Sequence, residues 1–388
     1  MKKVYLDNAA TTKVDEKVVK AMLPYFTDKY GNASSQHLTG SDAKIALENS
    51  RKIIAKKINA KSSEIIFTSG GTESNNFALK GLWFSQIENK TGKNHLITTK
   101  IEHDSILQVC KWLEKRGCTV TYLDVDEFGF INLEDLENAI NSKTFLVSVI
   151  SGNNEIGVIQ DIEEIGKICR GKKVLFHTDA CQSFTKIDLN VKKQDIDLMT
   201  LNAHKINGPK GIGALYISEK IQNGITPLLH GGGHEFKLRS GTENIPGIVG
   251  FAKAVDLVSK KDILKMEKLK NKLIEGLLKI ENVKLNGSLA EGKRLCNNVN
   301  VSFMNIEGEA VGGYLESYGI FTSTGSACMS NTLKSSHVLK ALGFGPLRAN
   351  SSLRISLSKD NTEEEINYFL KRISGIVKKL RRFSPLSK

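Results

Sequence analysis

The chain has 388 residues, of which 40% are hydrophobic and 25% are charged, and its formal net charge is +13. This is the composition of a globular protein with a large core, and the length suits two domains. No run of about 18 apolar residues occurs, so no transmembrane helix is expected. The first residues turn acidic and polar too soon for a signal peptide, so we expect a cytoplasmic protein without a membrane partner.

The positive charge would suit two kinds of partner, nucleic acid and an acidic protein. The lysines are densest at 260–272 and 378–382, where apolar residues recur at helical spacing. This spacing favours solvated helix faces, and no nucleic-acid-binding module accompanies it, so direct nucleic-acid binding is not expected. No C-x-x-C pair occurs, so we expect reduced thiols rather than a zinc ribbon or a redox pair. The six cysteines are Cys110, Cys118, Cys169, Cys181, Cys296 and Cys328.

The first predicted elements are an extended opening at 5–12, an amphipathic helix that ends near Phe26, and a long helix over about 41–58. From Glu64 onward, short β-branched runs alternate with polar breaks and helical patterns. This alternation predicts an α/β fold with a mainly parallel sheet that helices cover on both faces. The predicted strands are 65–68, 95–99, 144–150, 174–178, 198–201 and 212–217.

The pattern changes after Gly250. A lysine-rich stretch predicts one long helix over about 252–280, which would lead into a smaller domain. That domain would contain apolar segments at 297–303 and 353–357, and a final amphipathic helix from about Thr362.

A cluster of polar residues follows nearly every predicted strand of the first part. In open α/β sheets, ligands bind along the edge formed by the carboxyl ends of the strands. We therefore expect these clusters to meet in one pocket. They are Ser69–Glu73, Glu102–His103, Asn153–Glu155, Asp179–Gln182 and Asn202–Lys205.

Ser69-Gly-Gly-Thr-Glu73 stands between a strand and a helix, where free backbone N–H groups favour a phosphate. It is not a Walker loop, and Gly71-Thr72 could equally form a plain N-cap. His103 could be a satisfied buried histidine, or it could stack on a cofactor ring and shuttle protons. His230-Gly-Gly-Gly-His234 has metal-like spacing, but three glycines do not form the helix that such spacing needs, so no metal is expected.

Lys205 is either a surface lysine at a loop or a desolvated amine beside an aldehyde cofactor, since burial makes a lysine amine more nucleophilic. Asp179 is either a cap or salt-bridge partner, or a carboxylate that keeps a pyridinium nitrogen protonated. A phosphate cradle, a lysine and an aspartate are together the three parts that hold pyridoxal 5'-phosphate (PLP), and this favours the second interpretation of both residues.

Six segments resemble the cysteine desulfurases, PLP enzymes of the class V aminotransferase group with the fold-type I architecture. The resemblance runs from about Val4 to Pro385. It implies a large domain at 14–258 with a mainly parallel seven-stranded sheet, and a smaller α+β domain at 1–13 and 259–388 that carries a mobile cysteine loop at about 322–332. The segments are Tyr5-Leu-Asp-Asn-Ala-Ala-Thr-Thr12, Gly71-Thr-Glu-Ser74, Asn153-Asn-Glu-Ile-Gly157, His204-Lys205 with Gly208-Pro-Lys-Gly211, Arg239-Ser-Gly-Thr242 and Ser323-Thr-Gly-Ser-Ala-Cys328.

The resemblance also implies roles for individual residues. Lys205 matches the Schiff-base lysine, Asp179 the partner of the pyridine nitrogen, and His103 the stacked histidine. Gln182 and Asn154 match positions near the ring oxygen, and Arg354 matches the arginine that binds the substrate carboxylate, a task that suits its planar fork. The residues at phosphate-binding positions are Gly71, Thr72, Asn202, Ala203 and His204, with Thr242 reaching the phosphate from the other subunit of a homodimer.

Cys328 matches the cysteine that accepts sulfur, whereas Cys181 is expected to be a small packed residue. The resemblance implies conversion of L-cysteine to L-alanine, with a persulfide on Cys328 that passes to an iron–sulfur scaffold protein or a tRNA-thiolation relay. Asn202 and Ala203 depart from the serine and glycine common in the family, although an amide can still donate to a phosphate. A selenocysteine lyase is the nearest alternative activity. A PLP-free scaffold for sulfur-transfer partners is the alternative of another class.

Overall fold

The computed structural model describes residues 3–324 and 335–384. Its centre is a seven-stranded sheet with the order β2-β8-β7-β6-β5-β3-β4. β8 is antiparallel to both of its neighbours, and every other pair is parallel, so the predicted α/β fold with a mainly parallel sheet is confirmed. The strands are β2 (Ile65–Thr68), β3 (His95–Thr99), β4 (Thr119–Leu123), β5 (Thr144–Ser148), β6 (Leu175–Asp179), β7 (Leu198–Asn202) and β8 (Gly213–Ile217).

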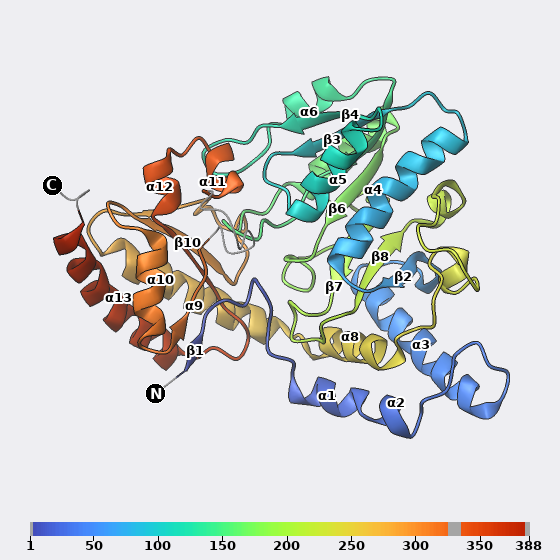
Figure 1. The fold of residues 1–388 in the computed structure, drawn as a ribbon, viewed down its shortest axis with the longest axis horizontal. Helices are drawn as coiled ribbons and strands as arrows, with labels where there is room; N and C mark the ends of the chain where they lie inside the picture. The colour runs from blue at the N-terminus through green and yellow to red at the C-terminus, as the bar shows by residue number, and fades with distance from the viewer. Residues whose placement is uncertain (1–2, 325–334, 385–388) are drawn as a thin grey trace.

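Helices cover both faces of this sheet because successive strand residues point to opposite sides. Ile66 faces a core shared with α4 and α5, whereas its neighbour Phe67 faces a core shared with α3 and α8. α7 also packs on the second face. Figure 1 shows α4 and α5 side by side on the first face. The helices of this part are α3 (Leu38–Lys57), α4 (Gly71–Glu88), α5 (Asp104–Glu114), α6 (Leu133–Ala139), α7 (Ile162–Lys172) and α8 (Ile245–Leu257).

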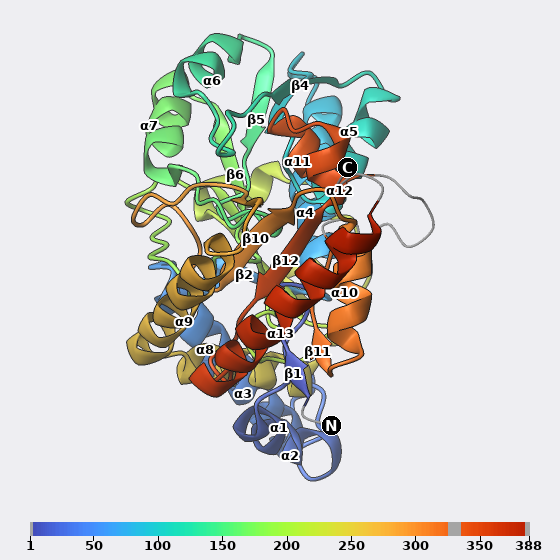
Figure 2. The same ribbon diagram turned by 90° about the vertical axis from the view of Figure 1, so that its left-hand side faces the viewer.

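The remaining residues build a second, smaller core around an antiparallel sheet with the order β12-β10-β9. Figure 2 looks onto this part, where α13 and α10 lie in front of β10 and β12. β1 (Val4–Tyr5) pairs with β11 (Ile320–Phe321), so the N-terminal residues join this core. Its other elements are α9 (Lys260–Leu278), β9 (Val283–Leu285), β10 (Asn298–Phe303), α10 (Gly308–Glu316), β12 (Ser352–Ser356) and α13 (Glu363–Phe383).

The prediction of a single helix over 252–280 is wrong. α8 ends at Leu257 and α9 begins at Lys260, with an extended Val258 between them. Ser259 starts the second helix: its hydroxyl accepts from the N–H of Asp262 at 3.3 Å, and the Asp262 carboxylate accepts from the N–H of Ser259 at 2.9 Å. This reciprocal capping satisfies backbone donors that a continuous helix would satisfy itself.

The predicted N-terminal helix is also divided, into α1 (Glu16–Met22) and α2 (Pro24–Thr27). The short helices α11 (His337–Ala341) and α12 (Pro346–Asn350) and three 3-10 turns at 62–64, 219–224 and 235–237 complete the elements of the described chain. None of the helices in the described ranges combines the length and the apolar character needed to cross a bilayer.

Candidate active site

A cavity of about 220 Å³ opens where the parallel strands of the large sheet end. Most of the predicted site residues line it, so the sheet edge does bring together clusters that are far apart in the sequence. Asn75 and Ser105, which were not predicted, line it as well. The predicted residues that line the cavity are Gly71, Thr72, His103, Asn154, Asp179, Gln182, Asn202, His204, Lys205 and Arg354.

Three predicted residues are placed elsewhere. Ala203 is fully buried and packs in the core beneath the cavity. Thr242 is exposed and lies at a separate cavity of about 170 Å³. Cys328 lies outside the described residues, as does most of the predicted cysteine loop.

Asp179 ends β6 with its carboxylate buried at the cavity. The side-chain amide of Asn75 donates to Oδ2 at 2.8 Å, and the N–H of Cys181 donates to Oδ1 at 2.9 Å. Burial by itself would raise the pKa of Asp179, but His103 and these two donors outweigh it and hold the pKa below its usual value. The group is therefore a fixed negative charge, which suits a partner with a protonated ring nitrogen.

His103 is the N-cap of α5, and its Nδ1 accepts from the N–H of Ser105 at 3.1 Å. This bond favours the tautomer that carries its proton on Nε2. Burial lowers the pKa of His103, and the charge of Lys205 lowers it further, against the opposite effect of Asp179. His103 is consequently a neutral imidazole near pH 7.

Asn75 and Ser105 connect His103 to Asp179. The Asn75 amide donates both to Asp179 and to the hydroxyl of Ser105 at 2.7 Å, and that hydroxyl lies 2.8 Å from His103 Nδ1. The signal that could have revealed Asn75 is its position one turn after Gly71 on the same helix, which places both residues on one face.

The start of α4 forms a cradle for an anion. Its N-cap, Gly70, has a φ of 154° and offers no side-chain cap, so the first backbone N–H groups of the helix stay available. A Cβ at Gly71 would lie 2.6 Å from the sulfur of Cys181, which explains the need for glycine. His204 also lines the cavity, and burial lowers its pKa to about 4, so this histidine is neutral near pH 7.

Lys205 stands in a tight turn after β7, closed by the N–H of Gly208, which donates to the carbonyl of Ala203 at 3.0 Å. A Cβ at Gly208 would approach Ala203 to 2.8 Å, so the turn requires glycine there. Behind the turn, the Lys186 amine donates to the carbonyl of Gln182 at 2.8 Å, and burial lowers the pKa of Lys186 to about 8. The same amine also donates to the carbonyl of Lys205 at 3.4 Å, so it joins the two segments that present Gln182 and Lys205.

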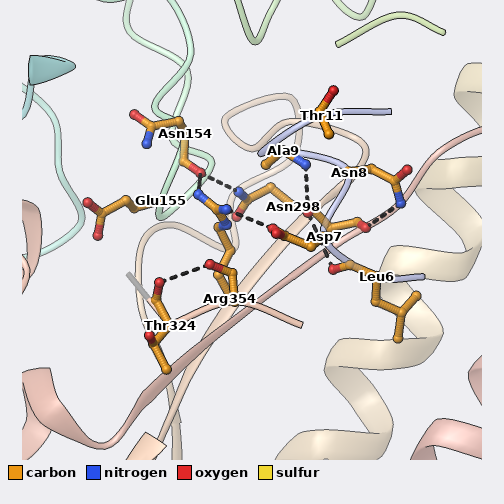
Figure 3. A network of polar contacts seen from close by, with 12 residues as sticks. Leu6, Asp7, Asn8, Ala9, Thr11, Asn154, Glu155, Asn298, Thr324 and Arg354 are labelled. Carbon is orange, nitrogen blue, oxygen red and sulfur yellow. Dashed lines mark hydrogen bonds and ion pairs between the residues drawn. The ribbon is translucent and has the colours of Figure 1, made fainter. Parts of the chain in front are cut away.

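Arg354 enters the cavity from β12 of the small core. Figure 3 shows its guanidinium between Asp7, whose Oδ1 accepts from Nη2 at 2.8 Å, and the carbonyl of Asn154, which accepts from Nη1 at 3.1 Å. Its buried Nε has no partner within the described part of the chain. The arginine is thus fixed in place and keeps a donor for an incoming carboxylate.

These residues fit PLP. The cavity is lined by the anion cradle, by the buried carboxylate of Asp179 and by the lysine Lys205. The buried Oδ1 atoms of Asn154 and Asn202 lack partners among the described residues, as expected where polar groups await a polar ligand. Over residues 3–324 and 335–384, no three histidine, cysteine, aspartate or glutamate side chains gather as they would around a metal ion.

Cys181 also borders the cavity but is only 7% exposed. Burial raises the pKa of its thiol well above the usual value, and the charge of Asp179 adds to this effect. A protonated, enclosed thiol is a poor nucleophile. The structure thus shows Cys181 as a packed residue.

The chain is similar to known proteins of one class. The family described as aminotransferase class-V matches residues 4–369, and this class depends on PLP, so the protein is a PLP-dependent enzyme. The chain is 48% identical to cysteine desulfurase IscS of Methanosarcina thermophila, over 100% of this chain and 95% of that protein.

Two solved structures are also similar to this chain in fold and in sequence. A NifS-like protein has a TM-score of 0.90 at 40% identity and covers 98% of this chain and 100% of its own. A structure described as SspA in complex with cysteine has a TM-score of 0.82 at 38% identity and covers 93% of this chain and 100% of its own. The chain belongs to the cysteine desulfurase family.

Proposed function

We propose that the enzyme converts L-cysteine to L-alanine and that Cys328 receives the sulfur as a persulfide. One observation carries the proposal: Lys205, Asp179 and Arg354, which come from three separate elements, line the same cavity. A lysine amine, a buried carboxylate and an arginine are what PLP and an amino-acid carboxylate need. The cysteine in the SspA structure supports the choice of substrate.

When bound, PLP withdraws electrons from the substrate α-carbon through its protonated ring. Asp179 would keep that ring nitrogen protonated, and His103 would contact the ring and move protons at Nε2. Arg354 would bind the substrate carboxylate, and Gln182 and Asn154 would help to hold the ring oxygen. The Lys205 amine would hold the cofactor and, when free, would act as the base for the substrate α-proton.

The sulfur step belongs to Cys328. Its thiolate attacks the substrate sulfur, so a sulfur–sulfur bond forms while the bond between the substrate sulfur and its β-carbon breaks. The carbon skeleton gains protons and leaves as alanine. The sum is L-cysteine plus the Cys328 thiol giving L-alanine plus a Cys328 persulfide, in which atoms and electrons balance.

Gly71, Thr72, Asn202 and His204, which line the cavity, would hold the phosphate, and Thr242 of a second subunit would complete the site in a homodimer. The exposure of Thr242, away from the cavity of its own chain, supports this assignment. The hydrophobic core around the antiparallel sheet is separate from the two cores on the faces of the large sheet, and this supports a large domain at 14–258 and a small domain at 1–13 and 259–388.

The persulfide would serve an iron–sulfur scaffold protein or another acceptor such as a tRNA-thiolation relay, in the cytoplasm, without direct binding of nucleic acid. Five cysteines in the described ranges are unpaired thiols, and this supports a reducing compartment.

Mass spectrometry after addition of L-cysteine tests the proposal. We expect one added sulfur on Cys328 and free alanine in the filtrate. Cys328→Ala is the matched control, because it should keep the visible absorbance of bound PLP and acquire no sulfur. Alanine production by Cys328→Ala at the wild-type rate would contradict the assignment of the acceptor.

A second variant tests the lysine. Lys205→Ala should lose the yellow colour that Lys205-bound PLP gives, and alanine formation should fall at least about 100-fold, because both the anchor and the base are removed. An undiminished rate in this variant would refute the proposed chemistry.

A further inference from the structure

Arg51 of α3 and Glu235, in the connection between β8 and α8, form a buried ion pair far along the chain from each other. Nη1 and Nη2 of Arg51 donate to the two carboxylate oxygens of Glu235 at 2.7 and 2.8 Å. Both side chains are only 2% exposed. A two-pronged contact of this kind fixes orientation as well as distance, and its burial keeps water from loosening it.

The same pair closes the free edge of the large sheet. β2 is an edge strand, paired on one side only, by β8. On its open side, the N–H of Phe67 donates to Glu235 Oε2 at 2.7 Å, and the carbonyl of Ile65 accepts from Arg51 Nη1 at 2.5 Å. The carboxylate and the guanidinium therefore occupy the place of a further strand and bind the connection to β2.

The connection is bent sharply where it is bound. Glu235, Phe236 and Lys237 have φ values of 49°, 58° and 68°, a run of left-handed conformations without glycine. Such a turn persists only where its surroundings hold it. The buried Arg51 guanidinium holds this turn in place, since its centre lies 4.9 Å from the rings of both Phe67 and Phe236.

Directly after this turn, Arg239 contacts α4, the helix whose first residues form the anion cradle. Arg239 Nε donates to Glu73 of α4 at 2.8 Å, and Glu73 also accepts from the N–H of Ser69, beside the cradle. Thr242 follows three residues later and is exposed. In Figure 1 the whole connection lies on the side of the sheet opposite the small core.

We propose that Arg51 and Glu235 are positioning residues for the cofactor site of a second copy of the chain. The ion pair clamps the turn 235–237 to the edge of β2, and the clamped turn directs Thr242 outward to the PLP phosphate bound by the partner subunit. The inference rests on the proposed homodimer and names the contacts within one chain that prepare its contribution to the other.

Loss of cofactor from the holoenzyme tests the proposal. Glu235→Gln keeps the size of the side chain but removes the charge, and we expect its dimer to lose PLP about tenfold faster than wild type during dialysis, the loss expected for one hydrogen bond to a phosphate. Arg51→Lys, which keeps a charge but lacks the fork, should behave alike. Glu219→Gln is the control. Glu219 lies in the same connection and forms an exposed ion pair with Lys61, so this variant should lose PLP at the wild-type rate.

Mixed dimers separate a contribution to the partner from a contribution within the chain. A Glu235→Gln chain is paired with a Lys205→Ala chain by two affinity tags, so that only the first chain can bind PLP through Lys205. That site faces an intact Glu235 in the partner, and we expect it to retain PLP as long as wild type does. Equally fast loss from mixed and Glu235→Gln dimers would overturn the proposal.

Retention of PLP by the Glu235→Gln homodimer at the wild-type rate would also overturn it. If Glu235→Gln gives no folded dimer, as judged by circular dichroism and size exclusion, Arg51→Lys takes its place in both measurements. A wild-type protein that never acquires the visible absorbance of bound PLP would instead refute the proposed function itself.

Discussion

Asp179 shows how one side chain depends on its neighbours at this site. Its pKa stays below the usual value only because His103 and the donors Asn75 and Cys181 together outweigh the effect of burial. We expect Asp179→Asn to lower kcat for alanine formation by about tenfold to 100-fold, since a charge-assisted hydrogen bond to the ring is lost. Asn75→Ala removes one donor and should have a smaller effect. An Asp179→Asn enzyme with unchanged kcat would contradict this role.

His103 gives a prediction about pH. Its pKa is lowered, chiefly by burial, so protonation requires a pH below the usual histidine value of about 6.5. If the neutral form is active, kcat/KM should stay level as the pH falls from 7.5 to about 6.5 and should decline only below that. His103→Gln should remove this acid limb, measured as alanine formation over the same range. A decline that begins above pH 7 would contradict the neutral assignment.

Glu102, next to His103, links stability to pH. Burial raises its pKa to about 8, even though the N–H of Ile150 and the hydroxyl of Thr99 each donate to Oε1 at 2.8 Å. The folded protein therefore keeps a proton that the unfolded chain releases at about pH 4.3. The resulting stability is fully present below about pH 4.3 and is lost as the pH rises to about 8, by about 1.4 kcal/mol per pH unit.

Glu102→Gln tests this link, because an amide does not titrate. From pH 5.5 to pH 8, the wild type should lose free energy of unfolding relative to Glu102→Gln, measured by urea denaturation of both proteins at each pH. A difference between the two proteins that stays constant over this range would show that Glu102 does not hold its proton in the folded state.

At the level of elements, Ser259 decides where α9 begins. We expect Ser259→Ala to lower the free energy of unfolding by about 1 kcal/mol, because the N–H of Asp262 loses its acceptor. Ser259→Asp is the matched control, since aspartate also caps helices. Urea denaturation followed by circular dichroism measures the difference. Equal stability of the alanine and aspartate variants would show that the cap has no effect.

The elements that were predicted from the sequence are those with a strong pattern of buried residues. The strands at the sheet centre are short, almost entirely buried runs that contain aliphatic or β-branched residues, and each predicted run overlaps an observed strand. β4 was not predicted because it is an edge strand whose residues, except Leu123, stay partly or fully exposed, so the apolar signal is weak. The break between α8 and α9 was missed because apolar residues continue at helical spacing through it, and only the Ser259–Asp262 pair marks it.

The site was predictable to the extent that it depends on strand ends. Lys205, Asp179 and Gly71 follow or end strands of one sheet, so their meeting follows from topology alone. Asn75 and Ser105 reach the site because of the direction in which their side chains leave α4 and α5. The pattern of strands in the sequence does not indicate that direction. Arg354 comes from the small core, and its arrival at the cavity depends on how the two parts pack, so only the family resemblance indicated it.

For the whole molecule, Arg294 joins the two cores. It is buried and donates to the carbonyls of Ile156, Asn286 and Ser288 at 2.8, 2.6 and 2.8 Å. Arg294→Met would leave these carbonyls without a donor, and we expect the free energy of unfolding to fall by about 3 kcal/mol.

A matched control for this variant is Arg381→Met. Arg381 also donates to backbone carbonyls, but it is only half-buried, and water can replace its exposed contacts with the carbonyls of Glu281 and Asn282. Thermal unfolding should therefore show a clearly larger decrease in midpoint for Arg294→Met. Similar midpoints for the two variants would mean that the contacts of Arg294 contribute little to joining the cores.

The enclosure of five thiols has a practical consequence. Cys110, Cys118, Cys169, Cys181 and Cys296 are all buried, and burial raises the pKa of each. A maleimide applied to the native protein should leave these five unlabelled. Whatever alkylation or sulfur uptake the intact fold permits can then be read as the chemistry of the single remaining cysteine, without mutating any of the others.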